Sequence, residues 1–502
     1  MKKLVSLALV LALALTMTAG IAFADAADPI KLTWAQGTGS TAPIDNAIVL
    51  EELNKISREK LNVECDIQYY TGDEIQLSIQ SGEVKDMYFT CSWYNNFNVN
   101  VSNGLFANIW GKVQEWTPEL YAIMSEDIWN LARSTDGGLY AIPVAKDVAP
   151  MNFIVYDKEF AENNGFDIPD RISAWSELTD YLVALQASMP EGQYAFTIGG
   201  TPAGWDTSFD FIDRTPMIGV IFGAEGEDAT KVCCEFDDPT IIDRLHTMRE
   251  WYTMGLINPD AATLSESSND SKQHHIKTVQ AWPGYDYSPS YGYPCGMTCY
   301  SGPFLNTDGV QGAMNAFSIT LEDDEERFMA AMKYQELVNT DWEYRNILRW
   351  GIEGVHVNYY DFTLEDGTTG KAAMRTDLGS SNYAPWAFSQ ASYPLAAVEC
   401  SQDQVDGKID PPVINQWELY YDAIANEAEI SAISGFTFDS SMFTNEYAEI
   451  SAIKAEYMNE IVTGTVDPDE KLPEMMEKLN AAGLQDIIAE AQRQLDEYLA
   501  SK

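Results

Sequence analysis

The most constraining feature of the sequence is an alternation of strand-like and helix-like segments near its N-terminus. Residues 31–35 have the pattern of a strand, and residues 45–61 carry apolar side chains at helical spacing. A second strand, a short helix ended by Gly82 and a third strand ending at Trp93 follow. Strands that alternate with helices form parallel sheets. The pattern predicts an α/β fold whose binding loops follow the carboxyl ends of the strands.

The N-terminus predicts a secretory signal peptide. Two lysines precede an apolar or small stretch over residues 4–21, and Ala22-Phe23-Ala24 provides the small residues of a cleavage site after Ala24. A transmembrane anchor is the alternative, but the strongly apolar part is short for a membrane span. No cysteine stands near the cleavage site for lipidation. We expect a secreted protein on the extracellular side of the cytoplasmic membrane.

Length and charge limit the architecture and the partners. A chain of 502 residues exceeds an ordinary single domain, and no Pro- or Ser-rich linker divides it, which predicts two lobes joined by short crossovers. The formal net charge of −47 disfavours nucleic acid as a partner. Because 46% of the residues are hydrophobic, a packed core is expected and the acidity belongs to the surface.

Cysteine and histidine give little indication of special chemistry. Of the seven cysteines, Cys295 and Cys299 are the best local candidates for a disulfide, and free thiols are the equally open alternative. With four histidines and no cysteines near His274 and His275, no metal site is predicted. The sequence also suggests no cofactor.

The C-terminal residues 484–501 predict a long helix that docks on a core. Leucine, isoleucine and alanine side chains recur there at helical spacing and would form one apolar face.

Four segments in a fixed order resemble the extracellular solute-binding proteins of ABC importers. They are GLYAIPVAKDVAPMNFIVYDKEF (138–160), TVQAWPGYD (278–286), GAMNAFSI (312–319) and the C-terminal region that begins at GFTFDSSMF (435–443). The resemblance is to family 1, the maltodextrin-binding-like group, and to a subgroup of Gram-positive bacterial members with a helical C-terminal region. It covers essentially the whole mature chain.

The resemblance implies a two-lobed periplasmic-binding-protein-like α/β fold, each lobe a mainly parallel sheet flanked by helices. It places lobe 1 at residues 25–145 plus 316–365 and lobe 2 at residues 146–315 plus 366–502. The implied function is capture of a carbohydrate in the cleft between the lobes by hinge closure. The solute would then pass to the transmembrane permease of an ABC importer, and the receptor is expected to be a monomer.

Candidate ligand-binding residues combine aromatic rings with polar groups in predicted loops or near the crossover. Rings meet the apolar faces of sugars, and amides, carboxylates and cationic groups meet their hydroxyls. For each residue the competing role is core packing or a local turn. The candidates are Gln36, Thr38, Trp93, Tyr94, Asn95, Lys146, Asp147, Trp205, Asp206, Trp282, Tyr285, Glu353 and Trp386.

Other functions remain as alternatives. A receptor for peptides or another nutrient would use similar residues. A glycoside hydrolase needs two carboxyl groups across a cleft, but among 77 acidic residues some pair always looks suitable, so no catalytic residue is predicted. The sequence has no G-x-S-x-G elbow, P-loop or zinc signature. An adhesive surface protein is disfavoured because the chain has no repeats or low-complexity stalk.

Overall fold

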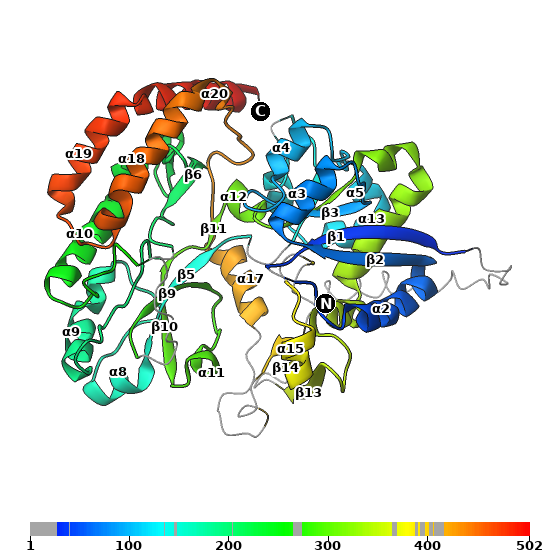
Figure 1. Ribbon diagram of the computed structural model, residues 1–502, viewed down its shortest axis with the longest axis horizontal. Coiled ribbons are helices and arrows are strands. Elements are labelled where there is room, and N and C mark those ends of the chain that lie inside the picture. The colour runs from blue at the N-terminus through cyan, green and yellow to red at the C-terminus, as the bar shows by residue number, and fades with distance from the viewer. Residues whose placement is uncertain are drawn as a thin grey trace, which may run out of the picture.

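The computed structural model has two α/β lobes that lie side by side (Figure 1). It describes residues 28–501 apart from Ser40, Thr135, 145–147, Ala203, 265–273, 364–368, 387–389, 392–396, 401–404 and 406–415. None of the helices in the described ranges is both long enough and apolar enough to cross a lipid bilayer. The predicted signal peptide, residues 1–24, lies outside these ranges.

Lobe 1 is built on a five-stranded sheet in the order β2-β1-β3-β12-β4. As predicted from the alternating pattern, β1 pairs in parallel with β2 and β3, with Trp34 opposite Ile67 and Met87. Strand β12 is antiparallel to both β3 and β4, since it enters from the other lobe. The strands are β1 (Ile30–Gly37), β2 (Val63–Tyr70), β3 (Met87–Thr90), β4 (Ala141–Pro143) and β12 (Met314–Phe317).

Helices cover the faces of this sheet, and their buried side chains form two main apolar clusters with it. The helices are α2 (Asn46–Leu61), α3 (Gly72–Gln80), α4 (Phe97–Ser102), α5 (Lys112–Trp116), α6 (Pro118–Ala122), α7 (Glu126–Leu131), α13 (Glu325–Thr340) and α14 (Trp342–Trp350), with the 3₁₀ turn η4 (Ile319–Asp323).

The main sheet of lobe 2 differs from the predicted parallel arrangement. Its order is β10-β5-β9, and both described pairings are antiparallel. The reason is topological: β5 arrives from lobe 1 and inserts between two strands that run the opposite way. A second antiparallel sheet has the order β6-β7-β8. The strands are β5 (Met151–Asp157), β6 (Phe209–Asp213), β7 (Ile218–Ile221), β8 (Cys233–Cys234), β9 (Lys277–Ala281) and β10 (Cys295–Ser301).

Three C-terminal helices pack on the outside of lobe 2 (Figure 1). The apolar stripe predicted for the last helix is confirmed: Leu484, Ile487, Ala491 and Leu495 are buried in the core of lobe 2. The helices of this lobe are α8 (Lys158–Asn164), α9 (Thr179–Ser188), α10 (Pro239–Thr253), α11 (Ser288–Tyr291), α12 (Thr307–Val310), α18 (Thr444–Val462), α19 (Pro468–Ala481) and α20 (Leu484–Ser501), with 3₁₀ turns η1 (Trp175–Leu178), η2 (Gly226–Thr230), η3 (Glu235–Asp237) and η6 (Ser441–Phe443).

The chain passes between the lobes at several points. The segment 138–160 contributes β4 to the sheet of lobe 1 and β5 to the sheet of lobe 2. The return path runs from β11 (Phe304–Leu305) through α12 to β12, and β11 pairs with β16 (Glu429–Ile430). Helix α17 (Gln416–Glu427) braces the first crossover, because the Tyr420 hydroxyl accepts from the Ala149 N–H (2.9 Å) and donates to the Ala149 carbonyl (2.8 Å).

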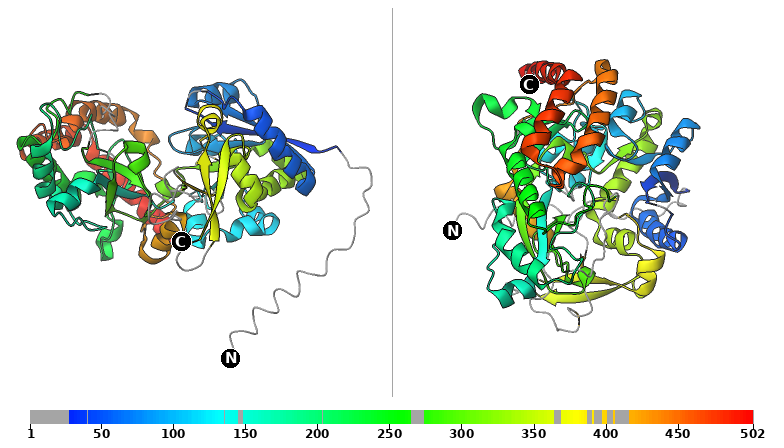
Figure 2. Two further views of the ribbon diagram at one scale, coloured as in Figure 1. Left: turned by 90° about the horizontal axis from the view of Figure 1, so that it is seen from below. Right: turned by 60° about the vertical axis from the view of Figure 1, so that its left-hand side comes forward.

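A hairpin of β13 (Val357–Thr363) and β14 (Thr369–Arg375) lies beneath lobe 1 (Figures 1 and 2). Its strands pair along their whole length, so the predicted lobe boundary at residue 365 falls between two partners. Helix α15 (Asp377–Asn382) also belongs with lobe 1, because the Asn382 amide donates to Asp45 at 3.0 Å. Lobe 1 therefore extends beyond residue 365. Strand β15 (Val398–Glu399) completes this small sheet.

All seven cysteines are free thiols. Cys295 and Cys299 both lie in the extended strand β10, where four residues span about 13 Å. A disulfide needs Cα atoms within about 7 Å, so this pair cannot bridge. Burial raises the pKa of the Cys91, Cys233, Cys234 and Cys295 thiols to about 12.

Candidate functional site

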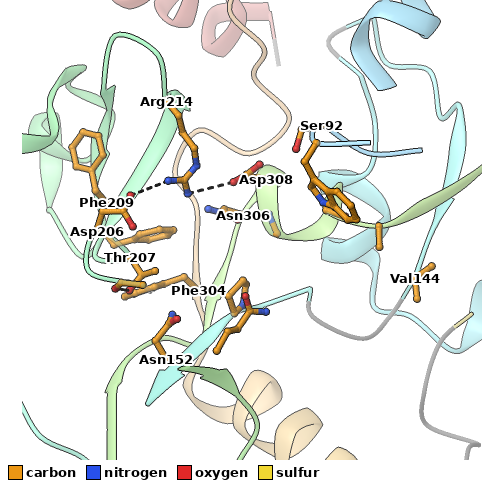
Figure 3. Close-up of a pocket in the computed structure, with 18 residues that line it drawn as sticks. Ser92, Val144, Asn152, Asp206, Thr207, Phe209, Arg214, Phe304, Asn306 and Asp308 are labelled. Carbon is orange, nitrogen blue, oxygen red and sulfur yellow. Dashed lines mark hydrogen bonds and ion pairs between the residues drawn. The ribbon is translucent and has the colours of Figure 1, made fainter. Parts of the chain in front are cut away.

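A cavity of about 610 Å³ lies between the two lobes (Figure 3). Lobe 1 contributes the loop after β3 and the start of the first crossover. Lobe 2 contributes residues from β5, β9 and the β6–β7 sheet, together with the segment 304–309 of the return crossover. The cavity is therefore formed where the chain passes from one lobe to the other, and a hinge movement there would change its width.

Trp93 supplies an aromatic surface on the lobe 1 side of this cavity. Its side chain is 55% exposed, and its indole N–H donates to the Gly312 carbonyl at 3.0 Å. The Trp386 ring lies 6.0 Å from the Trp93 ring and covers Gly37, where an added Cβ would come within 3.0 Å of the indole. The predicted residues Trp93 and Trp386 are thus brought together over the end of β1.

Tyr94 and Asn95 shape the loop that carries Trp93, and both are buried. The Tyr94 hydroxyl donates to the Tyr70 carbonyl at 2.9 Å. Asn95 has a left-handed φ of 49°, which asparagine tolerates better than most residues, and its amide donates to the Phe89 carbonyl at 3.1 Å. The structure gives these two residues a role in holding the loop.

On the lobe 2 side, Phe222 and Phe304 form a stacked pair with ring centroids 4.2 Å apart and planes inclined by 13°. Both rings line the cavity and are partly buried. Neither phenylalanine was among the candidates predicted from the sequence. In the sequence, the only indication of a site at these residues is that each follows a strand-like run beside Gly or Pro. Nothing in the local sequence indicates that two segments 82 residues apart would stack.

Asn152, on β5, is a polar group directed at the cavity. It is only 3% exposed, and among the described residues no acceptor reaches its amide nitrogen. The loop above it carries Gly204, with φ of +67°, where an added Cβ would lie 2.4 Å from the Asn152 Oδ1. Glycine at this position lets the loop close over the amide. Thr207, Gln280 and Asn306 add further hydrogen-bonding groups to the lining.

Arg214 extends from lobe 2 toward the cavity and pairs with two carboxylates (Figure 3). Its Nη1 lies 2.9 Å from Asp206 Oδ2, and its Nη2 lies 3.5 Å from Asp308 Oδ2. The guanidinium also rests on the Phe211 ring at 4.1 Å. Because both carboxylates engage one cation, they are arranged as an ion-pair network, which differs from the opposed acid and base of a glycoside hydrolase.

Two other predicted residues on lobe 1 make contacts within that lobe. Gln36 is buried, and its amide donates to Asn315 at 3.1 Å. The Thr38 hydroxyl donates to the Thr41 carbonyl at 3.0 Å. Glu353 is exposed in the turn before β13 and does not line the described cavity. Lys146 and Asp147 lie outside the described residues.

Among the predicted lobe 2 residues, Asp206 lines the cavity, whereas Trp205 is buried in the core. Trp282 and Tyr285 are partly buried outside the described cavity lining. The Trp282 ring packs on Trp417 at 4.8 Å and on Tyr285 at 5.7 Å. Trp282 packs against a small hydrophobic core that joins lobe 2 to the β13–β14 hairpin.

Asp210 supports the cavity from behind, because its Oδ1 accepts from the Asn306 amide at 2.9 Å. Burial raises the pKa of Asp210 to about 6. The folded protein therefore binds the carboxyl proton of Asp210 more tightly than the unfolded chain does, in which the pKa of an aspartate is about 3.9. The contribution of the protonated Asp210 to the stability of the folded protein is fully present below about pH 4 and is lost as the pH rises through about 6.

We predict that Asp210→Asn removes this pH dependence. Between pH 4 and pH 7 the free energy of unfolding of the wild type should fall relative to the variant by up to about 3 kcal/mol. Chemical denaturation of both proteins across this range measures the difference, in which all other titrating groups cancel. A difference that stays constant with pH would show that Asp210 is not a buried acid.

Comparisons with known proteins match a domain family, a relative in sequence and several solved structures. Residues 432–500 match a family described as a domain of unknown function (DUF3502). Over 462 residues the chain is 25% identical to a carbohydrate ABC transporter substrate-binding protein of Streptococcus pneumoniae serotype 4, covering 90% of this chain and 88% of that protein.

The crystal structure of the N-glycan transport solute binding protein NgtS from Streptococcus pneumoniae has a TM-score of 0.77 and 23% identity, covering 94% of this chain and 99% of that one. Its complex with Man5GlcNAc covers the same shares at 23% identity, with a TM-score of 0.66. An extracellular solute-binding protein from Bifidobacterium longum subsp. infantis covers 94% of this chain and 98% of its own, at 14% identity and a TM-score of 0.58. These comparisons confirm the resemblance predicted from the sequence, and the chain has the two-lobed fold of the solute-binding proteins of ABC importers.

Proposed function

We propose that this protein is an extracellular receptor that captures an oligosaccharide between its lobes and delivers it to an ABC permease. The observation that carries the proposal is the placement of aromatic faces on both sides of one cavity: Trp93 on lobe 1 and the Phe222–Phe304 pair on lobe 2. Closure of the lobes would bring these faces toward a solute held between them. The S. pneumoniae relative named as a carbohydrate substrate-binding protein supports this interpretation.

The chemistry of the lining suits a sugar. Pyranose rings present flat C–H faces, which pack on aromatic rings, and hydroxyl groups, which need donors and acceptors. The Asn152 amide, the Thr207 hydroxyl and the Asp206–Arg214 pair provide both kinds of hydrogen-bonding group. A buried amide nitrogen without an acceptor is destabilising by itself, so a ligand hydroxyl that accepts from Asn152 would gain affinity.

Of the residues predicted from the sequence, we propose Trp93 and Asp206 as direct ligand contacts, and Trp386 as the ring that supports Trp93. We further propose that the protein is secreted after cleavage behind Ala24 and acts as a monomer. A volume of about 610 Å³ is within the range of small-molecule sites and large enough for several sugar units.

A thermal-shift screen tests the proposal. Residues 25–502 are incubated with Man5GlcNAc, other neutral oligosaccharides, acidic oligosaccharides and a matched set of peptides. A glycan at 100 times its dissociation constant should stabilise the folded protein by about 2.7 kcal/mol. Stabilisation by peptides alone would contradict the carbohydrate proposal. The absence of a thermal shift with every compound tested would contradict solute capture. Release of reducing sugar from a glycan would instead indicate a hydrolase.

A further inference from the structure

The turn between β6 and β7 carries Arg214 into the cavity and has a strained backbone. Met217, at the end of this turn, has a left-handed φ of 58°, a conformation that costs a residue with a Cβ about 1–2 kcal/mol. The Asp213 side chain stabilises the turn from within, because its Oδ1 accepts from the Thr215 N–H at 2.8 Å. A turn that stores strain keeps its shape only if its surroundings hold it.

Helix α18 contacts this turn at two consecutive residues. The Tyr447 hydroxyl donates to Asp213 Oδ2 at 3.0 Å, and the Lys454 ammonium donates to the Arg214 carbonyl at 2.5 Å. Tyr447 and Lys454 are seven residues apart, so two helical turns separate them and they share one face of α18. Helix α18 thus contacts the turn on both sides of the Arg214 Cα, through the Asp213 side chain and through the Arg214 carbonyl.

A buried acidic residue, Glu235, lies at the end of the turn. Glu235 is 2% exposed, and its backbone N–H donates to the Met217 carbonyl at 2.9 Å. Among the described residues no donor reaches its Oε1. Burial raises the pKa of Glu235, and the nearby Asp206 raises this pKa further, whereas Lys454 and Arg214 lower it. Glu235 therefore contacts the turn through its backbone and lies near the charged groups of Lys454, Arg214 and Asp206.

We infer that α18, within the C-terminal domain of unknown function, positions Arg214 for ligand binding, with Tyr447 and Lys454 as the positioning residues. The inference rests on the proposed function, because Arg214 matters for affinity only if the cavity takes a ligand. Neither positioning residue lines the described cavity, so both would act on affinity through Arg214.

The test compares Lys454→Met, Lys454→Arg and Tyr447→Phe with the wild type. Lys471→Met serves as the matched control, since Lys471 belongs to the same domain but pairs with Glu474 on α19. Titration calorimetry with Man5GlcNAc, or with the glycan of largest thermal shift, measures affinity. Lys454→Met should raise the dissociation constant about tenfold and Tyr447→Phe about threefold. Lys454→Arg should restore most of the loss, and the control should leave affinity unchanged.

Two further measurements separate positioning from a general loss of stability. In an Arg214→Ala background, Lys454→Met should cause no additional loss of affinity, because the arginine side chain that Lys454 positions has been removed. Hydrogen exchange at the amides of residues 214, 215 and 217 should be faster in Lys454→Met and Tyr447→Phe, with or without ligand. Tyr447→Phe removes one hydroxyl, so it provides a folded variant if Lys454→Met is unstable.

Additive losses in the Arg214→Ala background would overturn the inference, because α18 would then act on affinity by another route. Unchanged exchange in the turn would overturn it whether or not a ligand is found. If the wild type binds no glycan, the proposed function fails and the claim about affinity falls with it. Changed exchange would in that case still show that α18 holds the turn.

Discussion

Replacing Trp93 by alanine is expected to raise the dissociation constant for the bound glycan by about 10- to 100-fold, corresponding to about 1.4–2.8 kcal/mol. The indole is 55% exposed and lines the cavity, so its removal deletes an aromatic contact without opening a hole in the core. The melting temperature of the ligand-free protein should change little. Titration calorimetry and a thermal melt of the same preparation measure the two effects.

Two variants sharpen this prediction. Trp93→Phe keeps an aromatic face and should recover part of the affinity. Trp342→Ala is the matched control, because this tryptophan is 41% exposed at the start of α14 and does not line the described cavity. Equal affinities for Trp93→Ala and the wild type would remove Trp93 from the site. A strongly destabilised Trp93→Ala would show that the ring is part of the fold.

Trp205→Ala is expected to act on stability, in contrast to Trp93→Ala, and to lower the free energy of unfolding by about 3–5 kcal/mol. The ring is 5% exposed in the core of lobe 2, and it packs on Phe236 with centroids 6.4 Å apart. The Trp205 carbonyl accepts from the buried Arg244 at 2.6 Å, so collapse around the vacated site would also disturb a charged partner.

Guanidinium denaturation of Trp205→Ala and the wild type measures this loss. A destabilisation below about 1 kcal/mol together with weakened glycan binding would instead assign Trp205 to the ligand site. The comparison with Trp93→Ala is direct, because both tryptophans occur in loops beside the cleft and differ mainly in burial.

The parts of the fold that the sequence predicted depend on local periodicity. The alternation over residues 31–93 was sufficient to predict the parallel pairing of β1, β2 and β3, and the apolar spacing after Leu484 was sufficient to predict α20. The direction of the strands beside β5 was beyond such reasoning. Periodicity identifies a strand, but its neighbours depend on where the chain re-enters the lobe.

The candidate site was predictable only as a region. Trp93 and Tyr94 are adjacent in one loop, yet one faces the cavity and the other is buried, because the direction of each side chain is set by contacts with Tyr70 and Gly312 that are distant in sequence. The burial of Gln36 was not predictable for the same reason, since burial on both faces of β1 is a property of the assembled sheet. Arg214 and Phe304 line the same cavity only because the tertiary structure brings their segments together.

The low reactivity expected of the native thiols makes this protein suitable for site-specific labelling at introduced cysteines. At neutral pH a thiol of pKa about 12 is only about 10⁻⁵ in the reactive thiolate form, so the partly exposed Cys233 and Cys295 should compete poorly for a maleimide. One cysteine introduced on the surface of each lobe would carry a donor and an acceptor dye with little background. The distance between the dyes would then report the closing of the lobes in solution, molecule by molecule.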